Sequence, residues 1–218
     1  MSINTAATDC TETLRNVPLQ PGDRLDHQTF MARYAAMGDS VWAERIAGRV
    51  RLMSPLRAVQ HGNPHALLAL WLGFYAAQFD GLTVSDNATV ILDADNDVQP
   101  DLCLYRQEGR VRTNELGYLV GPPELIIEVA GSSADYDLHQ KKDLYLQTGV
   151  VEYLVYKTPR QTIHWWSRQS NQWITVRPDA DRVWDSRLFS GLALDEVGLQ
   201  TDSGKRILRT LQKGIASS

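Results

Sequence analysis

The sequence reads VQPDLCLY at residues 98–105, PPELIIEVAGSS at 122–133, ADYDLHQKKDLYLQTG at 134–149 and VVEYLVYK at 150–157. The first, second and fourth segments are short, apolar and rich in β-branched residues, which predicts strands, whereas the third has helical spacing. The first two strands each carry one carboxylate among apolar neighbours, and the helix carries a lysine. We therefore expect the chain to be organised around a strand–strand–helix–strand unit.

Further elements are predicted on both sides of this unit. Segment 27–37 has helical spacing with Asp26 as N-cap, and segments 41–46 and 50–53 form a hairpin that turns at Ala47 and Gly48. We also expect a strongly apolar helix at 65–79 and a strand at 82–92. After the central unit we expect three short antiparallel strands, at 162–167, 172–176 and 182–186, and a C-terminal helix at 203–218 that starts near Ser203. The predicted fold is α/β of the α+β type, in which a mixed β-sheet is flanked by helices.

Length and composition restrict the class of protein. The 218 residues suit one domain, which we place at 25–218 after a flexible polar arm at 1–24. A net charge of -4 argues against coating of DNA through the whole surface, although it permits a locally basic cleft. The two cysteines are far apart in the sequence, and no signal sequence is visible. The longest apolar run is shorter than the roughly 20 residues that a membrane span needs. We therefore expect a cytoplasmic protein without membrane contact.

The two strand carboxylates, Asp101 and Glu128, are the first candidate site residues. An acid in a buried apolar strand is costly unless it is paired or binds a metal, and two such acids on neighbouring strands repel each other unless a cation lies between them. Mg²⁺ suits this position because it prefers hard oxygen ligands and needs only one or two carboxylates; Mn²⁺ is a second candidate. The alternative is structural, with both acids capping loops or pairing with Arg106 or Arg110.

Lys141 is the candidate cation of the protein itself. At about 100° per residue the apolar face of its helix is centred on Leu138, Leu144 and Tyr145, and Lys141 lies within this arc. A lysine on the sheet-facing side of a helix is expected to meet an acid, although lysine side chains often extend to water instead. Lys142 lies at the edge of the arc and is expected to be a solvated surface residue.

These residues carry a resemblance to a known family. Gln99–Asp101, Glu128-Val129 and the segment 137–145 (DLHQKKDLY) resemble a PD-(D/E)xK active site. Together with GVVEYLVY they are similar to the bacterial restriction endonuclease family of Uma type. The resemblance extends from about residue 25 to the end and includes LMSP at 52–55 and His61. It departs at Ala130, where the plain motif has lysine, so the lysine is expected on the following helix.

The resemblance implies a restriction-endonuclease-like core, Mg²⁺ dependence, hydrolysis of phosphodiester bonds in DNA and, often, a homodimer. It also implies that Glu44, in the first hairpin, contributes a further acid, as metal ligand or as holder of a water molecule. The alternative for Glu44 is an exposed cross-strand pair with Arg49 or Arg51. The cleft around these acids is expected to include His61, Gln99 and His139, and the alternative for His139 is a surface position.

Two other functions remain open from the sequence. A nuclease-like fold that no longer cuts could serve as a nucleic-acid-binding or protein-interaction module. A metal-dependent hydrolase of another phosphate ester is the third hypothesis, because a fold does not determine a substrate. His61 and His65 have i, i+4 spacing, but no third zinc ligand is evident, and Gly62-Asn63-Pro64 between them predicts a helix start.

Overall fold

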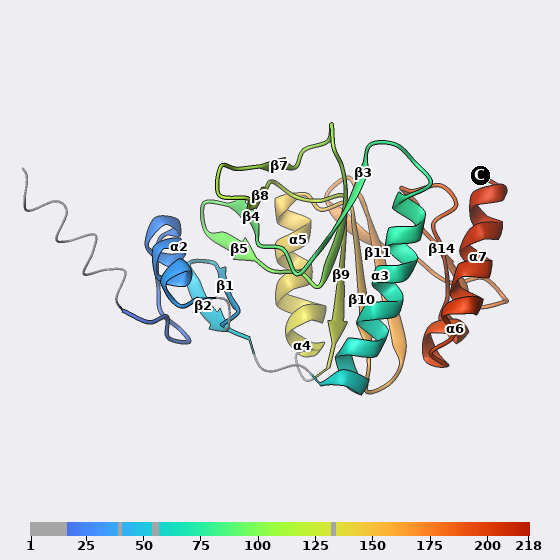
Figure 1. Cartoon of the computed structure of the whole chain (residues 1–218), viewed down its shortest axis with the longest axis horizontal. Helices are drawn as coiled ribbons and strands as arrows, with labels where there is room; N and C mark the ends of the chain where they lie inside the picture. Colours follow the sequence, from blue (N-terminus) through green and yellow to red (C-terminus); the bar gives the residue numbers. More distant parts are fainter. Residues whose placement is uncertain (1–16, 39–40, 54–56, 132–133) are drawn as a thin grey trace, which may run out of the picture. The chain divides into compact units, whose positions relative to one another are not determined.

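The computed structural model describes residues 17–38, 41–53, 57–131 and 134–218. Contacts within the chain divide it into two compact units. The hairpin unit comprises residues 1–55 and 89–99, and the sheet unit comprises residues 56–88 and 100–218. Each unit is described by itself below, with the element labels of Figure 1.

In its described residues, the hairpin unit contains one helix and four antiparallel strands. In chain order these are α2 His27–Ala36, β1 Ala43–Ile46, β2 Arg49–Leu52, β4 Val90–Asp93 and β5 Asn96–Val98, and the strands lie side by side as β2-β1-β5-β4. Asp26 caps α2 as predicted, because its Oδ1 accepts a hydrogen bond from Thr29 N at 2.7 Å. The predicted turn is also confirmed. Ala47 and Gly48 both have positive φ, 50° and 70°, which suits a two-residue hairpin loop.

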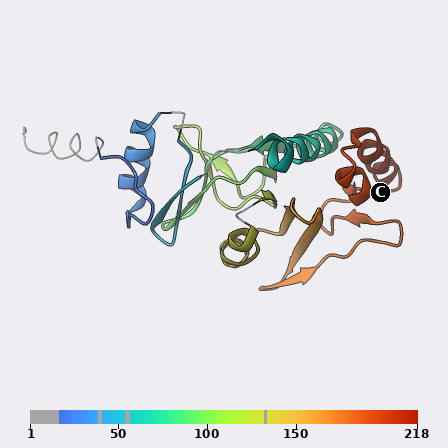
Figure 2. The ribbon, with the colours of Figure 1, turned by 90° about the horizontal axis from the view of Figure 1, so that it is seen from below.

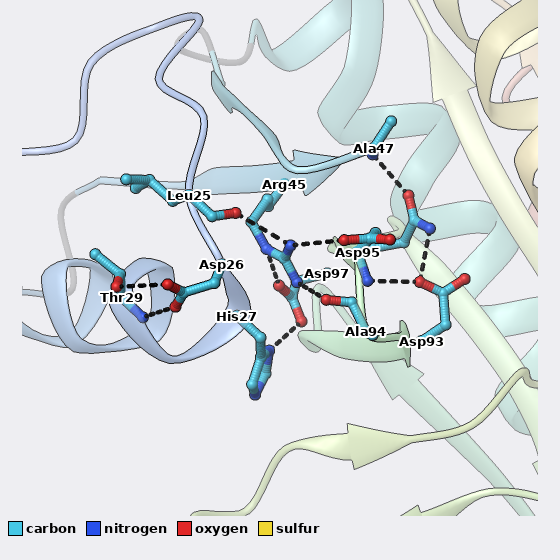
Figure 3. Close-up of polar contacts among 11 residues, drawn as sticks. Leu25, Asp26, His27, Thr29, Arg45, Ala47, Asp93, Ala94, Asp95 and Asp97 are labelled. Carbon is cyan, nitrogen blue, oxygen red and sulfur yellow. Dashed lines mark hydrogen bonds and ion pairs between the residues drawn. The ribbon is translucent and has the colours of Figure 1, made fainter.

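A buried ion pair fixes the register of this unit. Arg45 on β1 lies directly opposite Asp97 on β5, and Arg45 Nε donates to Asp97 Oδ2 at 2.7 Å (Figure 3). Both side chains are 0% exposed, and His27 Nδ1 lies 2.9 Å from the other oxygen of Asp97. Burial raises the pKa of Asp97, against the lowering effect of Arg45 and then of His27. Phe30 and Val50 belong to the small apolar core nearby.

The sheet unit is built on one mixed sheet. Its strands are β3 Leu82–Asp86, β6 Leu102–Arg106, β9 Leu125–Ala130, β10 Glu152–Lys157, β11 Thr162–Gln169 and β12 Gln172–Thr175, and they lie in the order β12-β11-β10-β9-β6-β3. Only β9 and β10 pair in parallel, which is the pair that brackets the predicted helix. The predicted mixed sheet and the antiparallel strands after it are therefore confirmed. Two small hairpins accompany the sheet, formed by β7 Arg112–Thr113 with β8 Leu119–Val120 and by β13 Val183–Asp185 with β14 Ala193–Asp195.

Helices cover both faces of this sheet (Figures 1 and 2). They are η1 Ala58–Gly62, α3 Asn63–Ala76, α4 Ala134–Tyr136, η2 Asp137–Lys141, α5 Lys142–Thr148, α6 Glu196–Gln200 and α7 Gly204–Ala216, where η marks a π-helical turn. Buried side chains of α3 and α7, such as Trp71 and Leu211, join Ile127 and Leu154 in the main apolar core. The opposite face of the sheet is covered by α5, which ends at Gly149 with φ 93°.

Some expectations differ in detail from the structure. Residues 82–92 form two strands rather than one, and Asn87, with φ 49°, lies between them. Of the predicted flexible arm, residues 1–16 lie outside the described residues, while Leu19 is 1% exposed. The single domain over 25–218 stays a prediction. No helix in the described part of the chain is long and apolar enough to cross a membrane.

Candidate active site

The structure places Asp101 directly before β6 and Glu128 on the adjacent strand β9. Leu102 pairs with Ile127 in the antiparallel β6–β9 ladder, so Asp101, one residue earlier, lies opposite Glu128. Asp101 Oδ2 accepts a hydrogen bond of 2.6 Å from the backbone N–H of Val129, which fixes this carboxylate against β9. The register therefore places the two predicted carboxylate residues opposite each other at the start of β6.

Glu128 lies in a buried environment that combines a cation and a hydroxyl group. Its side chain is 6% exposed, and Oε1 accepts from Lys141 Nζ at 2.9 Å and from Tyr145 OH at 3.0 Å. The Lys141 side chain is 1% exposed. Since a buried ion is costly unless it is paired, the ammonium and the carboxylate each make the burial of the other possible. The predicted meeting of Lys141 with an acid is thus seen in the structure.

A π-helical turn presents Lys141 to the sheet. η2 ends at Lys141 and continues into α5, so Tyr145 follows one helical turn later on the same face. Tyr153 OH on β10 donates to the backbone carbonyl oxygen of Asp137 at 3.0 Å, which attaches the start of η2 to the sheet. Lys142 is not the solvated residue that was predicted. It is half-buried, and its Nζ lies 4.2 Å from the centre of the Trp166 ring.

Two histidines, His61 on η1 and His65 on α3, contact Asp101, and only His61 contacts its carboxylate within the described residues. His61 is buried, and its Nε2 lies 3.0 Å from Asp101 Oδ1. His65 Nε2 lies 3.2 Å from the backbone oxygen of Asp101 and 2.9 Å from Asp86 Oδ1. Because a carbonyl oxygen and a carboxylate only accept hydrogen bonds, Nε2 of His65 carries the proton. The predicted helix start between the two histidines is confirmed, since α3 begins at Asn63. The π-helical turn η1, which was not predicted, leads directly into α3, and the two histidine rings lie 5.5 Å apart.

The remaining predicted residues are His139, Glu44 and Gln99. His139 is exposed on η2. Glu44 belongs to the hairpin unit, where it is 0% exposed and its Oε1 accepts a hydrogen bond of 3.0 Å from the backbone N–H of Gln99. The side-chain oxygen of Gln99 accepts from Tyr34 OH at 3.2 Å. Glu44 is therefore buried and hydrogen-bonded, unlike the exposed cross-strand pair that was its alternative.

The donor set fits a hard divalent cation. Within the described ranges no three His, Cys, Asp or Glu side chains form a group that could hold a metal ion. Mg²⁺ needs fewer protein ligands than such a group supplies, because it usually keeps several waters and binds one or two carboxylates. Asp101, directly before β6, and Glu128, on the adjacent strand β9, offer that set of oxygens. Burial raises the pKa of the Cys103 thiol to about 12, which keeps this thiol protonated and makes it a poor metal ligand.

The sequence did not reveal three contacts of the site. Tyr145 was assigned to the apolar face of its helix, although its position four residues after Lys141 on one face was a signal for a shared partner. His65 and Asp86 were not connected with Asp101, and their contact gave no sequence signal because it joins separate elements. The backbone N–H of Val129 was likewise not foreseen as a partner of Asp101.

Comparison with known proteins supports this description of the fold. No curated protein matches the sequence. A solved structure described as a "putative nuclease belonging to DUF820", from Anabaena variabilis ATCC 29413, has a TM-score of 0.59 and 15% sequence identity, and the match covers 74% of this chain and 90% of that one. At this identity the similarity concerns the fold. The Uma2 family model, described as "Putative restriction endonuclease", matches residues 28–196, and this chain therefore belongs to the Uma2 family.

Proposed function

We propose that this chain is a Mg²⁺-dependent endonuclease, also able to use Mn²⁺, that hydrolyses phosphodiester bonds in DNA. The observation that carries the proposal is the contact of Glu128 Oε1 with Lys141 Nζ at 2.9 Å, on the strand next to Asp101. Two carboxylates and a buried lysine at one end of a sheet match what hydrolysis of a phosphodiester requires. Membership of a family described as restriction endonucleases agrees with it.

Each side chain has a separate role in this proposal. Asp101 and Glu128 provide the oxygens that hold the cation, and the Val129 N–H keeps Asp101 in place. Lys141 orients the attacking water and places positive charge near the phosphate oxygens as their charge increases. Tyr145 holds Glu128 in position through its hydroxyl group. When bound, Mg²⁺ would supply a Lewis acid that polarises the phosphate and lowers the pKa of water.

The proposal also gives a role to Glu44 and a dimeric state to the protein. We assign Glu44 as an additional acid that holds water or metal, in keeping with its complete burial. Each chain carries one Asp101–Glu128 pair, so cleavage of both DNA strands at one site is expected to need two copies. Light scattering of the purified protein, with and without DNA, tests whether the protein forms a dimer.

The decisive experiment measures metal binding and cleavage on the same variants. Mg²⁺ and Mn²⁺ binding is followed by calorimetry for the wild type, Asp101→Asn and Glu128→Gln, and cleavage is assayed on supercoiled, linear and single-stranded DNA and on RNA. Asp101→Asn is the cleaner variant because asparagine keeps an oxygen that can accept from Val129 N–H. Glu108→Gln with Glu115→Gln removes negative charge from two exposed sites and serves as the matched control.

The expected result is saturable metal binding and DNA cleavage by the wild type and the control, with both lost in the two site variants. A wild type that binds neither cation, with or without DNA, would rule out the catalytic proposal and favour the binding-module alternative. Cleavage of simple phosphate esters without cleavage of nucleic acids would assign the site to another substrate class.

A further inference from the structure

A cationic cluster lies on the same sheet face as Glu128. Glu128 pairs with Val155 in the parallel β9–β10 ladder, and Ala130 pairs with Lys157. Side chains of alternate residues share a face, so Lys157 lies on the face of Glu128, roughly 7 Å further along the strands. His164, opposite Val155 on β11, lies on that face as well.

Aromatic rings connect this cluster with the active-site helix. The rings of Tyr145 and Tyr153 are 4.9 Å apart, and those of Tyr153 and Trp166 are 5.8 Å apart and stacked. Lys142 Nζ lies over Trp166, and the His164 ring stacks on the same tryptophan at 5.9 Å. The row of rings holds Lys142 and His164 beside η2 and α5, the elements that carry Lys141 and Tyr145.

The charges of this cluster are not neutralised by acids. Neither Lys142 nor Lys157 has an ion pair with an acid in the described part of the chain, and both are half-buried rather than extended into water. The pKa of His164 is lowered by burial first and then by the charges of Lys157 and Lys142, which agrees with the two ammonium groups lying close to this imidazole. A cluster of like charges without acidic partners favours a bound anion.

The other basic surface differs in this respect. Lys205, Arg209 and Lys213 recur every four residues along α7 and form one stripe. They line a groove of about 670 Å³ together with Asp181, Asp185 and Asp195. Since acids face this stripe, it is a poorer surface for phosphate than the first cluster.

We propose that Lys142, Lys157 and His164 form a phosphate-binding surface that holds the DNA backbone next to the Glu128–Lys141 pair. The partner is recognised by its chemistry, a run of phosphodiesters. Lys142 and Lys157 each contact one phosphate, and the Trp166 ring keeps the Lys142 ammonium in a fixed position. This inference rests on the proposed function, because it names the surface that would bring the substrate to the site.

The test measures binding without catalysis. A fluorescent DNA duplex is titrated in EDTA at several salt concentrations with the wild type, with Lys142→Gln plus Lys157→Gln, and with Lys205→Gln plus Lys213→Gln as the matched control of equal charge change. The logarithm of the association constant falls linearly with the logarithm of the salt concentration, and loss of two phosphate contacts makes this slope less steep by about 1.8. A third variant, Lys142→Arg plus Lys157→Arg, keeps the charge and is expected to retain the slope. Melting temperatures confirm that each variant is folded.

The expected result is a smaller slope and weaker binding only in the Lys142/Lys157 glutamine variant. An unchanged slope in that variant, or an equal change in the α7 control, would overturn the inference. The two proposals can fail separately. DNA that binds through this surface but is never cut would contradict the endonuclease, whereas DNA that is cut with an unchanged slope would contradict the phosphate-binding surface. A wild type that binds no DNA contradicts the inference directly.

Discussion

Lys141 Nζ lies 2.9 Å from Glu128 Oε1, and both groups are buried. Removal of one partner of a buried pair leaves an uncompensated charge, so Lys141→Met is expected to lower the free energy of unfolding by about 3–5 kcal/mol. Urea denaturation followed by tryptophan fluorescence measures this change. Lys142→Met is the control, because loss of its contact with Trp166 is expected to cost only about 0.5–1 kcal/mol. Equal effects of the two substitutions would contradict the assignment of Lys141 to a buried ion pair.

Tyr145→Phe separates positioning from chemistry. The variant loses the 3.0 Å hydrogen bond to Glu128 Oε1 while its ring stays in contact with Tyr153. A hydrogen bond to a charged group contributes about 1.5–3 kcal/mol, and a loss of this size in unfolding free energy is expected. Under the proposed function, kcat on DNA falls while KM stays near the wild-type value. Tyr153→Phe, which loses only its bond to the Asp137 carbonyl, should weaken stability but leave Mg²⁺ affinity unchanged.

The Arg45–Asp97 pair is expected to hold the hairpin unit together. Arg45→Met leaves the Asp97 carboxylate buried without its 2.7 Å partner, and a loss of about 3–5 kcal/mol is predicted. Amide hydrogen exchange of β1 and β5 reports the loosening directly. Arg45→Met combined with Asp97→Leu should recover much of the stability, because an apolar pair needs no desolvation of charge. Asp95→Asn is the control, since Asp95 is 76% exposed at 4.0 Å from Arg45.

Glu152 predicts a pH dependence of stability. It is buried at the start of β10 and accepts hydrogen bonds from Ser186 Oγ and from the backbone N–H groups of Arg187 and Leu188. Burial nevertheless raises its pKa, so the folded chain binds this proton more tightly than the unfolded chain does. The contribution of Glu152 to stability is therefore fully present below the unfolded pKa, about 4.3, and is lost as the pH rises through the folded pKa.

Glu152→Gln removes this titration. Urea unfolding at pH 4, 5, 6 and 7 is expected to show a difference between variant and wild type that shifts in favour of the variant as the pH rises. The exposed Glu115→Gln serves as reference and should show no such trend. A constant difference across this range would mean that Glu152 titrates alike in the folded and unfolded chains.

Much of the sheet unit could be predicted because its sequence follows simple periods. Alternation in the strands identified the neighbours of Asp101 and Glu128, and the 100° period of the helix directed Lys141 rather than Lys142 toward the sheet. The π-helical turns could not be predicted in this way, because an i to i+5 hydrogen-bond pattern leaves little trace in the spacing of apolar residues.

Contacts between segments far apart in the sequence could not be predicted either. Arg45 and Asp97 are 52 residues apart, and His61 and Asp101 are 40 apart, so neither pairing follows from local pattern. The half-buried position of Lys142 depends on Trp166, which lies on a strand after the helix. Local periods indicate which face of an element is apolar, whereas the partner on that face is decided by the packing of the whole unit.

The hydrogen bond from Val129 N–H to Asp101 Oδ2 has a consequence for how this family can diverge. Asparagine at position 101 could accept the same bond, so under the proposed function one substitution there removes a metal ligand while the strand end stays intact. At Glu128 the same kind of change leaves a buried ammonium without its counter-charge. Lineages that abandon cleavage are thus expected to lose the aspartate first and to retain the glutamate–lysine pair longer.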